Sequence, residues 1–458
     1  MISLSAPDAT MYWLSRRTRN DQFLLYCFAE STRDDSELRT EILDRCAGIP
    51  ELRVRLRDDP TGLTYPAWIP AEPDPAQVVR HQLAAPSWPE LLAAVGRSAG
   101  TGVDATQYPW LLHIFRGICD SPAPDAQVTV VVLQISHALV DGRGAARIAR
   151  ALFTQPVRSA GDLAAEGAAT GRMARAAAPA AASPLRSLGA AAALPVGMVR
   201  TVRRGIGAAR ARRELDALTA AGRVPRPGGG YPSGPLNRPA EVTGHSVQML
   251  VWPASEFRVP GLTVTVVGLT AVSIAVERYL RSRGAEVTRL GAQVPMALPP
   301  RPGIRNNYRS LGVDLGAGER DPLRRAAAIA TELAARRERA GHPLLAAQDS
   351  VTAVLPPLLL RRDVHSYPID TVPEQITGHT VVSSVNRGPA DLAFGGAPVR
   401  FTGGFPALGA VMHLTHGIHG LGETVTLSVH ADPGVVPDLD TYAGHLSDAV
   451  RELVRSAG

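Results

Sequence analysis

The sequence of 458 residues contains no lysine, so all 48 of its Lys and Arg positions are arginine. This absence excludes mechanisms that need a lysine amine: Schiff-base catalysis, attachment of pyridoxal phosphate, a Walker-A nucleotide site and a serine–lysine dyad. Arginine stays protonated at working pH, so it binds anions but is a poor proton shuttle. General acid–base chemistry therefore has to come from His, Asp, Glu, Tyr or Cys.

Cysteine and long apolar runs are also scarce. Cys27, Cys46 and Cys119 are too few for a disulfide framework and show no C-x-x-C spacing, which favours a reducing compartment. No run of about 18 apolar residues occurs, and the N-terminus lacks the basic and apolar regions of a signal peptide. We therefore expect a cytoplasmic protein, with peripheral contact to a membrane surface left open.

The overall composition, 45% hydrophobic and 20% charged with a net charge of +6, is that of a globular protein. The arginines are spread along the chain, and no zinc-finger or RNP-type motif combines them with aromatic residues. We therefore expect no nucleic-acid partner.

Apolar patterns predict strands and helices in both halves of the chain. Val128–Ile135 is a run dominated by β-branched residues, typical of a buried strand, and Leu91, Leu92 and Val95 share one face of a helix. Further strands are expected at residues 23–28, 380–384, 399–401, 411–414 and 424–429, and helices at 145–152, 323–339 and 439–454. These elements predict the α/β (α+β) class, with mixed sheets flanked by helices in both halves.

A change of composition divides the chain. Between about 157 and 230 it is dominated by Ala, Gly, Pro and Arg, which predicts an N-terminal domain at 1–156, a crossover linker at 157–234 and a C-terminal domain at 235–458. In the linker, Val199, Val202 and Ile206 recur at helical spacing among arginines. Such a helix either lies on anionic lipid or covers the other domain, and both alternatives stay open.

The leading candidate for chemistry is His137-Ala-Leu-Val-Asp141-Gly142. A histidine at the end of a buried strand is held rigidly and points into the space beyond the sheet, which suits a proton acceptor. Asp141 is expected to fix the loop by pairing with an arginine, and Gly142 to permit a tight turn into the following helix. A structural histidine is the alternative, because three specified positions in six match often by chance.

Other motifs fit their chemistry less well. Gly96–Gly100 matches the G-x-S-x-G pattern of serine hydrolases at Ser98, but a helix precedes it where a nucleophile elbow needs a strand. Gly142–Gly144 begins a dinucleotide motif, but Arg147 occupies its third glycine position. We expect neither a hydrolase nor a dinucleotide site.

His413, His416 and His419 are spaced closely enough to suggest zinc. On one strand, however, His416 faces away from the other two. We therefore expect no metal site and no bound cofactor.

The segment QISHALVDGRGAARIARAL resembles the HxxxDG active-site signature of the chloramphenicol-acetyltransferase-like acyltransferases, which include the condensation domains of peptide synthetases and the bacterial wax ester synthase/diacylglycerol acyltransferase family. The chain is similar to that last family over nearly its full length, through LSAPDATMYWL, DATQYPWLLHIF, VPMALPPR, RNNYRSLGVDL, SVNRGPADLAFGGAPV and LSVHADPGVVPDLD. Ser136 replaces the first of the family's two histidines, and the family's Asn-Asp pair is replaced around Thr265.

The resemblance implies two chloramphenicol-acetyltransferase-like domains, pseudo-dimeric, with a channel at their interface. His137 would be the general base that lets an acceptor hydroxyl, or an amine, attack a thioester of coenzyme A or of an acyl carrier protein, without a covalent acyl-enzyme. Ester synthesis, as in wax esters, acylglycerols or a natural product, is then expected. Amide-forming condensation and a non-catalytic binding module are the alternatives. The candidate oxyanion or substrate contacts are Ser136, Asn307, Ser384 and Asn386, while Asp141 and Gly142 shape the site.

Overall fold

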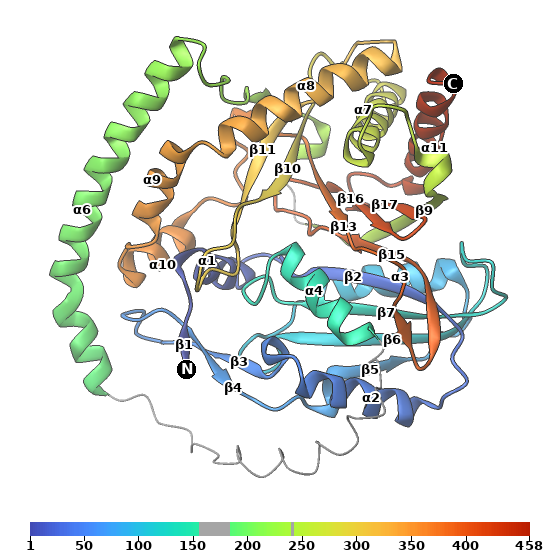
Figure 1. The fold of residues 1–458 in the computed structure, drawn as a ribbon, viewed down its shortest axis with the longest axis horizontal. Coiled ribbons are helices and arrows are strands. Elements are labelled where there is room, and N and C mark those ends of the chain that lie inside the picture. The colour runs from blue at the N-terminus through green and yellow to red at the C-terminus, as the bar shows by residue number, and fades with distance from the viewer. Residues whose placement is uncertain (155–183, 240–241) are drawn as a thin grey trace, which may run out of the picture.

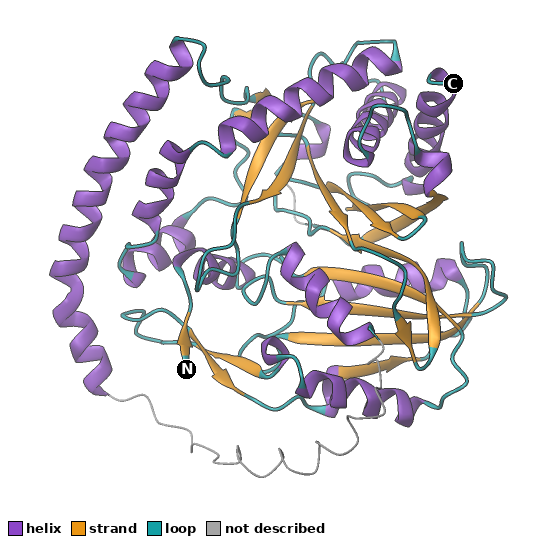
Figure 2. Ribbon diagram, in the orientation of Figure 1, coloured by secondary structure: helices purple, strands orange, loops and turns teal. Residues whose placement is uncertain are grey.

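The computed structural model describes residues 1–154, 184–239 and 242–458, and over residues 184–197 it gives the course of the backbone alone. Within these residues, two six-stranded sheets form the centre of the molecule, and helices flank both (Figure 1, Figure 2). This mixed arrangement of sheets and helices confirms the expected fold class.

The first sheet has the strand order β14, β15, β2, β7, β6 and β5. Its strands are β2 (Gln22–Ala29), β5 (Val78–His81), β6 (Trp110–Ile118), β7 (Val128–Ile135), β14 (Ala393–Phe394) and β15 (Ala397–Phe405). Alternate residues of β7 belong to apolar cores on opposite faces of the sheet. Because both faces are covered, β7 is a continuous apolar run, and the strand predicted at Val128–Ile135 is confirmed.

The second sheet has the strand order β11, β10, β13, β16, β17 and β9. Its strands are β9 (Ser246–Pro253), β10 (Gly291–Ala297), β11 (Tyr308–Asp314), β13 (Thr380–Asn386), β16 (Leu414–Leu421) and β17 (Thr424–Ala431). The strand predicted at 411–414 was placed too early. β16 contains Gly417 and Gly420 among its histidines, which dilute the apolar signal that would have identified it.

The two halves of the chain share the first sheet. β15 pairs antiparallel with β2, from Val399 opposite Phe28 to Phe405 opposite Phe23, and β14 extends the same edge. β15 also lies against β16 and β17 of the second sheet. The first sheet is therefore not built from residues 1–156 alone, and the predicted junction at 156/157 lies outside the described residues.

The helices fall into two sets around these sheets (Figure 1). They are α1 (Ala6–Ser15), α2 (Asp35–Ala47), α3 (Trp88–Ala99), α4 (Gly142–Phe153), α6 (Pro184–Ala220), α7 (Val264–Ser282), α8 (Pro322–Ala340), α9 (Pro343–Thr352), α10 (Pro357–Ser366) and α11 (Leu439–Ser456). Small sheets join β1 (Ile2–Ser3) and β3 (Val54–Arg57) to β4 (Ala67–Pro70), and β8 (Tyr231–Pro232) to β12 (Gln375–Ile376). In the described part of the chain, no single helix is long and apolar enough to span a membrane; α9 and α10, bent by 96°, pass that test as a pair on length and composition only.

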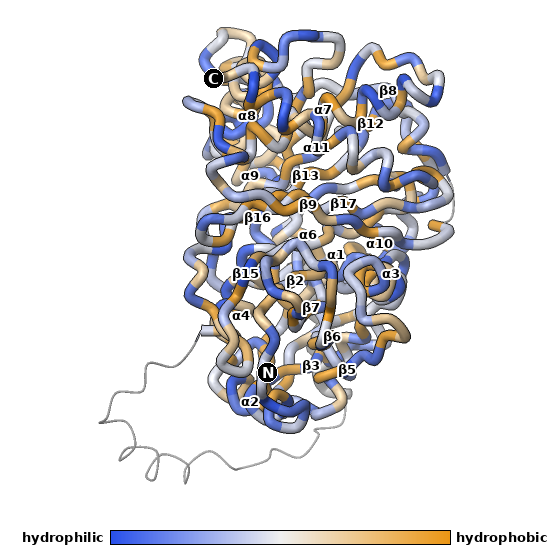
Figure 3. The backbone as a smooth tube through the Cα atoms, turned by 90° about the vertical axis from the view of Figure 1, so that its right-hand side faces the viewer, coloured by the Kyte–Doolittle hydropathy of each residue, from blue (hydrophilic) through white to orange (hydrophobic). Residues whose placement is uncertain are grey.

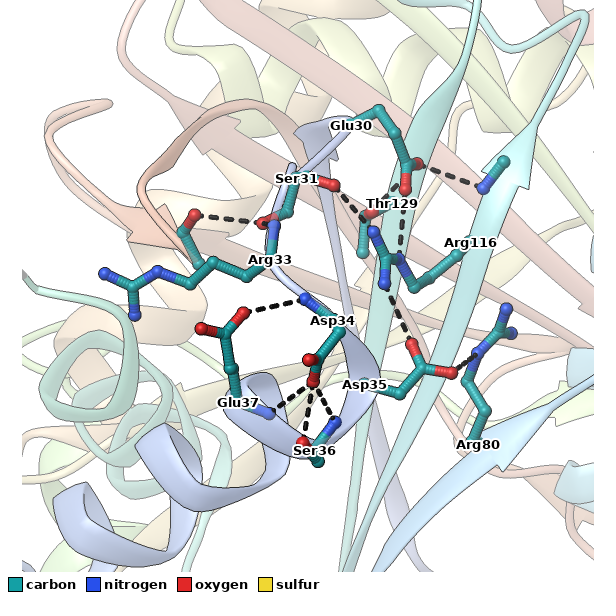
Figure 4. Close-up of polar contacts among 12 residues, drawn as sticks. Glu30, Ser31, Arg33, Asp34, Asp35, Ser36, Glu37, Arg80, Arg116 and Thr129 are labelled. Carbon is teal, nitrogen blue, oxygen red and sulfur yellow. Dashed lines mark hydrogen bonds and ion pairs between the residues drawn. The ribbon is translucent and has the colours of Figure 1, made fainter.

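An arginine network ties the start of α2 to the first sheet (Figure 4). Arg116 on β6 bonds Glu30 at 3.0 Å and Asp35 at 2.9 Å, and Arg80 on β5 bonds Asp35 at 3.0 Å. Asp34 caps α2 by accepting hydrogen bonds from backbone N–H groups of its first turn. These partly exposed pairs stabilise the fold modestly, and the hydrophilic α2 lies at the outer end of the N-terminal half (Figure 3).

Candidate active site

The loop that follows β7, residues 136–141, is here called the His137 loop. Its first residue extends the hydrogen bonding between β6 and β7, because Ser136 N donates to Pro109 O at 2.9 Å. Leu139 N then donates to Ser136 O at 2.9 Å and closes a turn. Gln22 Nε2 donates to Val140 O at 2.5 Å. Ala138, Leu139 and Val140 are all buried, so the backbone that carries His137 is held from several sides.

His137 meets Asn306, which lies in the loop between β10 and β11. His137 Nδ1 is 2.7 Å from Asn306 Oδ1, and Asn306 Nδ2 donates to the carbonyl oxygen of His137 at 2.7 Å. Asn306 is buried, whereas the imidazole of His137 remains partly exposed. The two halves of the chain therefore meet at the candidate base.

The hydrogen bonds of Asn306 fix the protonation pattern of the imidazole. Asn306 Nδ2 donates both to His137 O and to Asp8 Oδ1, at 3.0 Å, so the amide nitrogen occupies that side and Oδ1 faces the ring. An amide oxygen only accepts, so His137 Nδ1 carries the hydrogen. Nε2 of neutral His137 then holds the lone pair that a general base needs.

Asp8, in the first turn of α1, holds the Asn306 loop. Its carboxylate accepts hydrogen bonds from Asn306 N at 2.7 Å, from Arg305 N at 3.2 Å and from the hydroxyl of Ser5 at 2.6 Å. Asp8 is only 2% exposed, and a buried carboxylate needs such donors. Arg305 also donates to Leu139 O at 3.2 Å, which joins the Asn306 loop directly to the His137 loop.

The surroundings of His137 keep it neutral. Burial lowers its pKa from the ordinary value near 6.5, although the hydrogen bond that the ring donates to Asn306 Oδ1 and the charges of Asp141 and Asp8 act in the opposite direction. The ring of Tyr308 lies 5.9 Å from that of His137, and burial raises the pKa of its phenol. Imidazole and phenol are both uncharged at neutral pH, which suits the imidazole for accepting a proton.

Asp141 acts as a helix cap. Its carboxylate accepts a hydrogen bond from Gly144 N at 2.8 Å at the start of α4. Among the residues that the structure describes, no arginine forms the expected ion pair with Asp141. The glycine that packing requires is Gly144, where a Cβ would lie 2.8 Å from that of Val140; Gly142 has room for one, and its φ is not positive.

The other predicted contacts lie in different surroundings. Ser136 is buried, and its hydroxyl accepts a hydrogen bond from Ala138 N at 3.3 Å. Asn307 donates to Pro299 O, so its neighbour Asn306 is the one that contacts His137. Ser384 lies 2.8 Å from the hydroxyl of Thr265, and Asn386 is exposed and accepts from Gly388 N.

The competing motifs do not form sites. Ser98 lies within α3 and donates to Ala94 O at 3.1 Å, as an ordinary helical serine does. His413 contacts Asp432, His416 contacts Thr380 and Tyr442, and the three histidines do not converge. Over the described residues, no group of three or more His, Cys, Asp or Glu side chains is placed to hold a metal ion.

Asp8 and Asn306 are the site residues that the sequence analysis missed. Asp8 stands in the first turn of α1, where Ser5 caps the helix, and an acidic residue is common at such a position for local reasons alone. Asn306 stands beside Asn307 in RNNYRSLGVDL, and adjacent residues of a loop give no signal for which side chain turns inward. The one available signal was the resemblance of that segment to the family.

Two family models match the chain. The model described as the wax ester synthase/diacylglycerol acyltransferase catalytic domain matches residues 4–243, more than half of the chain. The model of the C-terminal domain of the same family matches residues 305–454. Asp8 and His137 lie in the first match and Asn306 in the second, so the site draws on both.

Solved structures share the fold over the whole chain. The wax ester synthase/diacylglycerol acyltransferase from Marinobacter aquaeolei VT8 is 17% identical, with a TM-score of 0.62 and 100% of each chain covered. The starter condensation domain of rhizomide synthetase RzmA, in complex with C8-CoA and Leu-SNAC, is 14% identical, with a TM-score of 0.54, and the match covers 100% of this chain and 94% of that one. These similarities confirm the two-domain, chloramphenicol-acetyltransferase-like fold.

Proposed function

Because the chain belongs to the wax ester synthase/diacylglycerol acyltransferase family and is an O-acyltransferase, we propose that it transfers an acyl group from a thioester donor to an acceptor hydroxyl, with His137 as general base. The observation that carries this proposal is the pair of hydrogen bonds between His137 and Asn306, which leaves Nε2 as the free base. The donor is a thioester of coenzyme A or of an acyl carrier protein, and the product is an ester.

In the proposed mechanism His137 Nε2 takes the proton of the acceptor hydroxyl while its oxygen attacks the thioester carbon. The C–S bond of the tetrahedral intermediate then breaks, and the imidazolium returns the proton to the leaving thiolate. Direct transfer needs no nucleophilic side chain. Consistent with this, Cys27 and Cys46 are buried and burial raises the pKa of both thiols, that of Cys46 to about 12.

For the oxyanion of the intermediate we propose Ser384 as a hydrogen-bond donor. Its Oγ lies 2.8 Å from Thr265 Oγ1 at the first turn of α7, and either oxygen can be the donor in that bond. The two hydroxyls carry two hydrogens and share one bond, so one hydrogen is left for a ligand.

We also propose that the protein contacts an anionic membrane surface through α6. Four large apolar side chains of α6 are 50–61% exposed: Met198, Val199, Val202 and Ile206. Residues 184–213 contain no acidic residue, and arginines flank the apolar side chains. α6 stands at the edge of the molecule (Figure 1), as a helix that lies on lipid must.

The test of the acyl transfer is thiol release from acyl-CoA and from acyl carrier protein in the presence of a long-chain alcohol, with ester formation followed by mass spectrometry. His137→Ala is expected to lower the rate by about 10²–10⁴-fold, the range for a lost general base. The exposed His365 on α10 provides the matched control, His365→Ala. Equal rates in wild type and His137→Ala would overturn the proposal.

Two further measurements decide between the alternatives. An amine acceptor that is consumed faster than the alcohol would show an amide-forming enzyme. Labelling by a fluorophosphonate that Ser98→Ala abolishes would show a serine hydrolase, which the helical position of Ser98 argues against.

A further inference from the structure

A cavity of about 640 Å³ lies between the two halves of the molecule, beside the C-terminal end of α1. Residues 15–19 form one side of its wall, and His245, Asp370 and Leu408 from the C-terminal half lie on the others. Cavities of this size hold small molecules or a large part of one.

Two chain segments connect this cavity to the candidate active site. α1 carries Asp8 in its first turn and Ser15 at its end, and the rise of an α-helix places these residues roughly 10 Å apart along its axis. Gln22, three residues after Arg19, donates to Val140 O of the His137 loop. Residues 15–19 of the cavity wall therefore lie on the stretch of chain between Asp8 and Gln22, which hold the Asn306 loop and the His137 loop.

The wall of the cavity is positively charged. Arg16, Arg17 and Arg19 all line it, and Asp370 is the acidic residue among its lining residues. Arg16 and Arg19 are exposed, and neither takes part in an ion pair within the described ranges. Their guanidinium groups are therefore available to an anion.

Arg17 has a different role in the same wall. Its Nη1 donates to Val364 O at 2.5 Å and to Tyr367 O at 2.7 Å, which ties the end of α10 to the end of α1. The side chain of Arg19 lies against Gly102, where its Nη1 is 3.0 Å from the position that a Cβ would take. The two unpaired arginines thus project from a wall that is itself held in place.

We propose that Arg16 and Arg19 bind a phosphate group carried by one of the two substrates, with the cavity holding the part of the substrate that bears it. Guanidinium groups bind phosphate oxygens through paired N–H donors, and a chain without lysine has no other permanently charged group for this task. A concave wall selects a discrete anion, in contrast to the convex face of α6. The phosphate belongs either to a donor such as coenzyme A or to a phosphorylated alcohol.

The proposal rests on the proposed acyl transfer only for the identity of the ligand as a substrate. Binding is therefore measured first without turnover, by calorimetric titration of the full chain carrying His137→Ala with coenzyme A and, separately, with glycerol 3-phosphate. Adding Arg16→Gln and Arg19→Gln is expected to raise the dissociation constant of one of these ligands at least tenfold. Arg39→Gln, an exposed arginine of α2 outside the wall, is the matched control.

Kinetics on the wild-type background then identify the source of the phosphate. If the donor carries it, Arg16→Gln/Arg19→Gln raises KM for an acyl-CoA but not for the same acyl group on N-acetylcysteamine. If the acceptor carries it, KM rises for the phosphorylated alcohol and not for its dephosphorylated form. The proposal is overturned if the two arginines change neither binding constant, or if both ligands fail to bind; loss of turnover in all variants would instead refute the proposed function.

Discussion

Asn306 and His137 are joined by two hydrogen bonds that run in opposite directions, one between Asn306 Oδ1 and His137 Nδ1 and one from Asn306 Nδ2 to the carbonyl oxygen of His137, each 2.7 Å long. One side chain from the C-terminal half therefore sets both the tautomer of the imidazole and the position of its backbone. Asp8 in turn sets the position of Asn306. The imidazole is therefore oriented before substrate binds, and in the proposed mechanism such orientation of the base is a source of catalytic rate.

Replacing Asn306 by Ala tests whether Asn306 positions the imidazole of His137. We expect kcat to fall at least tenfold, because the tautomer with Nδ1–H is no longer fixed. The acid limb of the pH profile should also move to lower pH, because the lost hydrogen bond favoured the imidazolium form. Asn307→Ala is the control, since its amide donates to Pro299 O and should leave both quantities unchanged. Equal effects of the two substitutions would contradict the assignment.

The pH dependence of the wild-type enzyme provides a second test. In the proposed mechanism His137 acts as a base only when neutral, and burial lowers its pKa from the usual value near 6.5. The acid limb of kcat/KM is therefore expected below pH 6.5, with activity retained in mildly acidic buffer. Initial rates with a saturating alcohol between pH 4.5 and 8 measure the limb. An acid limb above 6.5 would show that the imidazolium is stabilised instead.

Asp8 is expected to matter for stability as well as for rate. In Asp8→Asn an NH2 group replaces one carboxylate oxygen, so it faces hydrogen-bond donors and cannot accept from them. A buried polar group that loses its hydrogen bond in this way costs about 1–3 kcal/mol of stability. The thermal unfolding midpoint should fall and kcat should fall with it, because Asn306 loses its anchor. Asp44→Asn on the exposed face of α2 is the matched control and should change neither.

Several buried histidines predict loss of stability in acid. Burial lowers the pKa of His416 to about 3 and those of His113 and His430 to about 4. The unfolded chain binds protons at these histidines near pH 6.5 while the folded chain does not, so this stability is complete above pH 6.5 and is lost as the pH falls toward 4. Each unit of lowered pKa corresponds to about 1.4 kcal/mol per group.

Unfolding midpoints between pH 7 and pH 4 check this expectation. His416→Gln should reduce the dependence on pH, whereas His365→Gln, at an exposed position of α10, should not. If His416→Gln does not fold, His113→Gln serves as a second variant. A slope that neither variant changes would place the acid sensitivity elsewhere.

The membrane contact of α6 is tested by sedimentation with vesicles of anionic phospholipid. Val202→Asp together with Ile206→Asp should reduce the pelleted fraction severalfold, because both side chains are at least half exposed. Ala217→Asp together with Ala220→Asp adds the same charge at exposed positions farther along α6 and is the control. Pelleting that is unchanged in all variants, or that is equal on neutral vesicles, would remove the proposal.

The sequence was sufficient where local pattern determines structure. The apolar run of β7, the helix α8 and the helix of the HxxxDG motif follow from side-chain periodicity alone, and the structure confirms them. The candidate base was also accessible, because a histidine at the end of a buried strand has few other arrangements. In these segments the information lies within about a dozen neighbouring residues.

Long-range partners were not accessible in this way. Nothing in residues 5–8 indicates that Asp8 bonds a loop near residue 306, and Asn306 differs from Asn307 only in the direction that the loop turns. Asp141 was predicted to fix its loop by pairing with an arginine, whereas its carboxylate accepts a hydrogen bond from the backbone N–H of Gly144 in α4. The pairing of β15 with β2 was missed for the same reason, since each strand alone is consistent with either sheet.

That pairing has a consequence during synthesis of the chain. When β2 leaves the ribosome, its neighbour β15 has not yet been made, so the first sheet has an open edge until residues 397–405 emerge. Unpaired strand edges bind other chains readily. The N-terminal half is therefore expected to need a chaperone during translation, and fragments that end before Ala397 should aggregate even though they contain His137 and the whole HxxxDG motif.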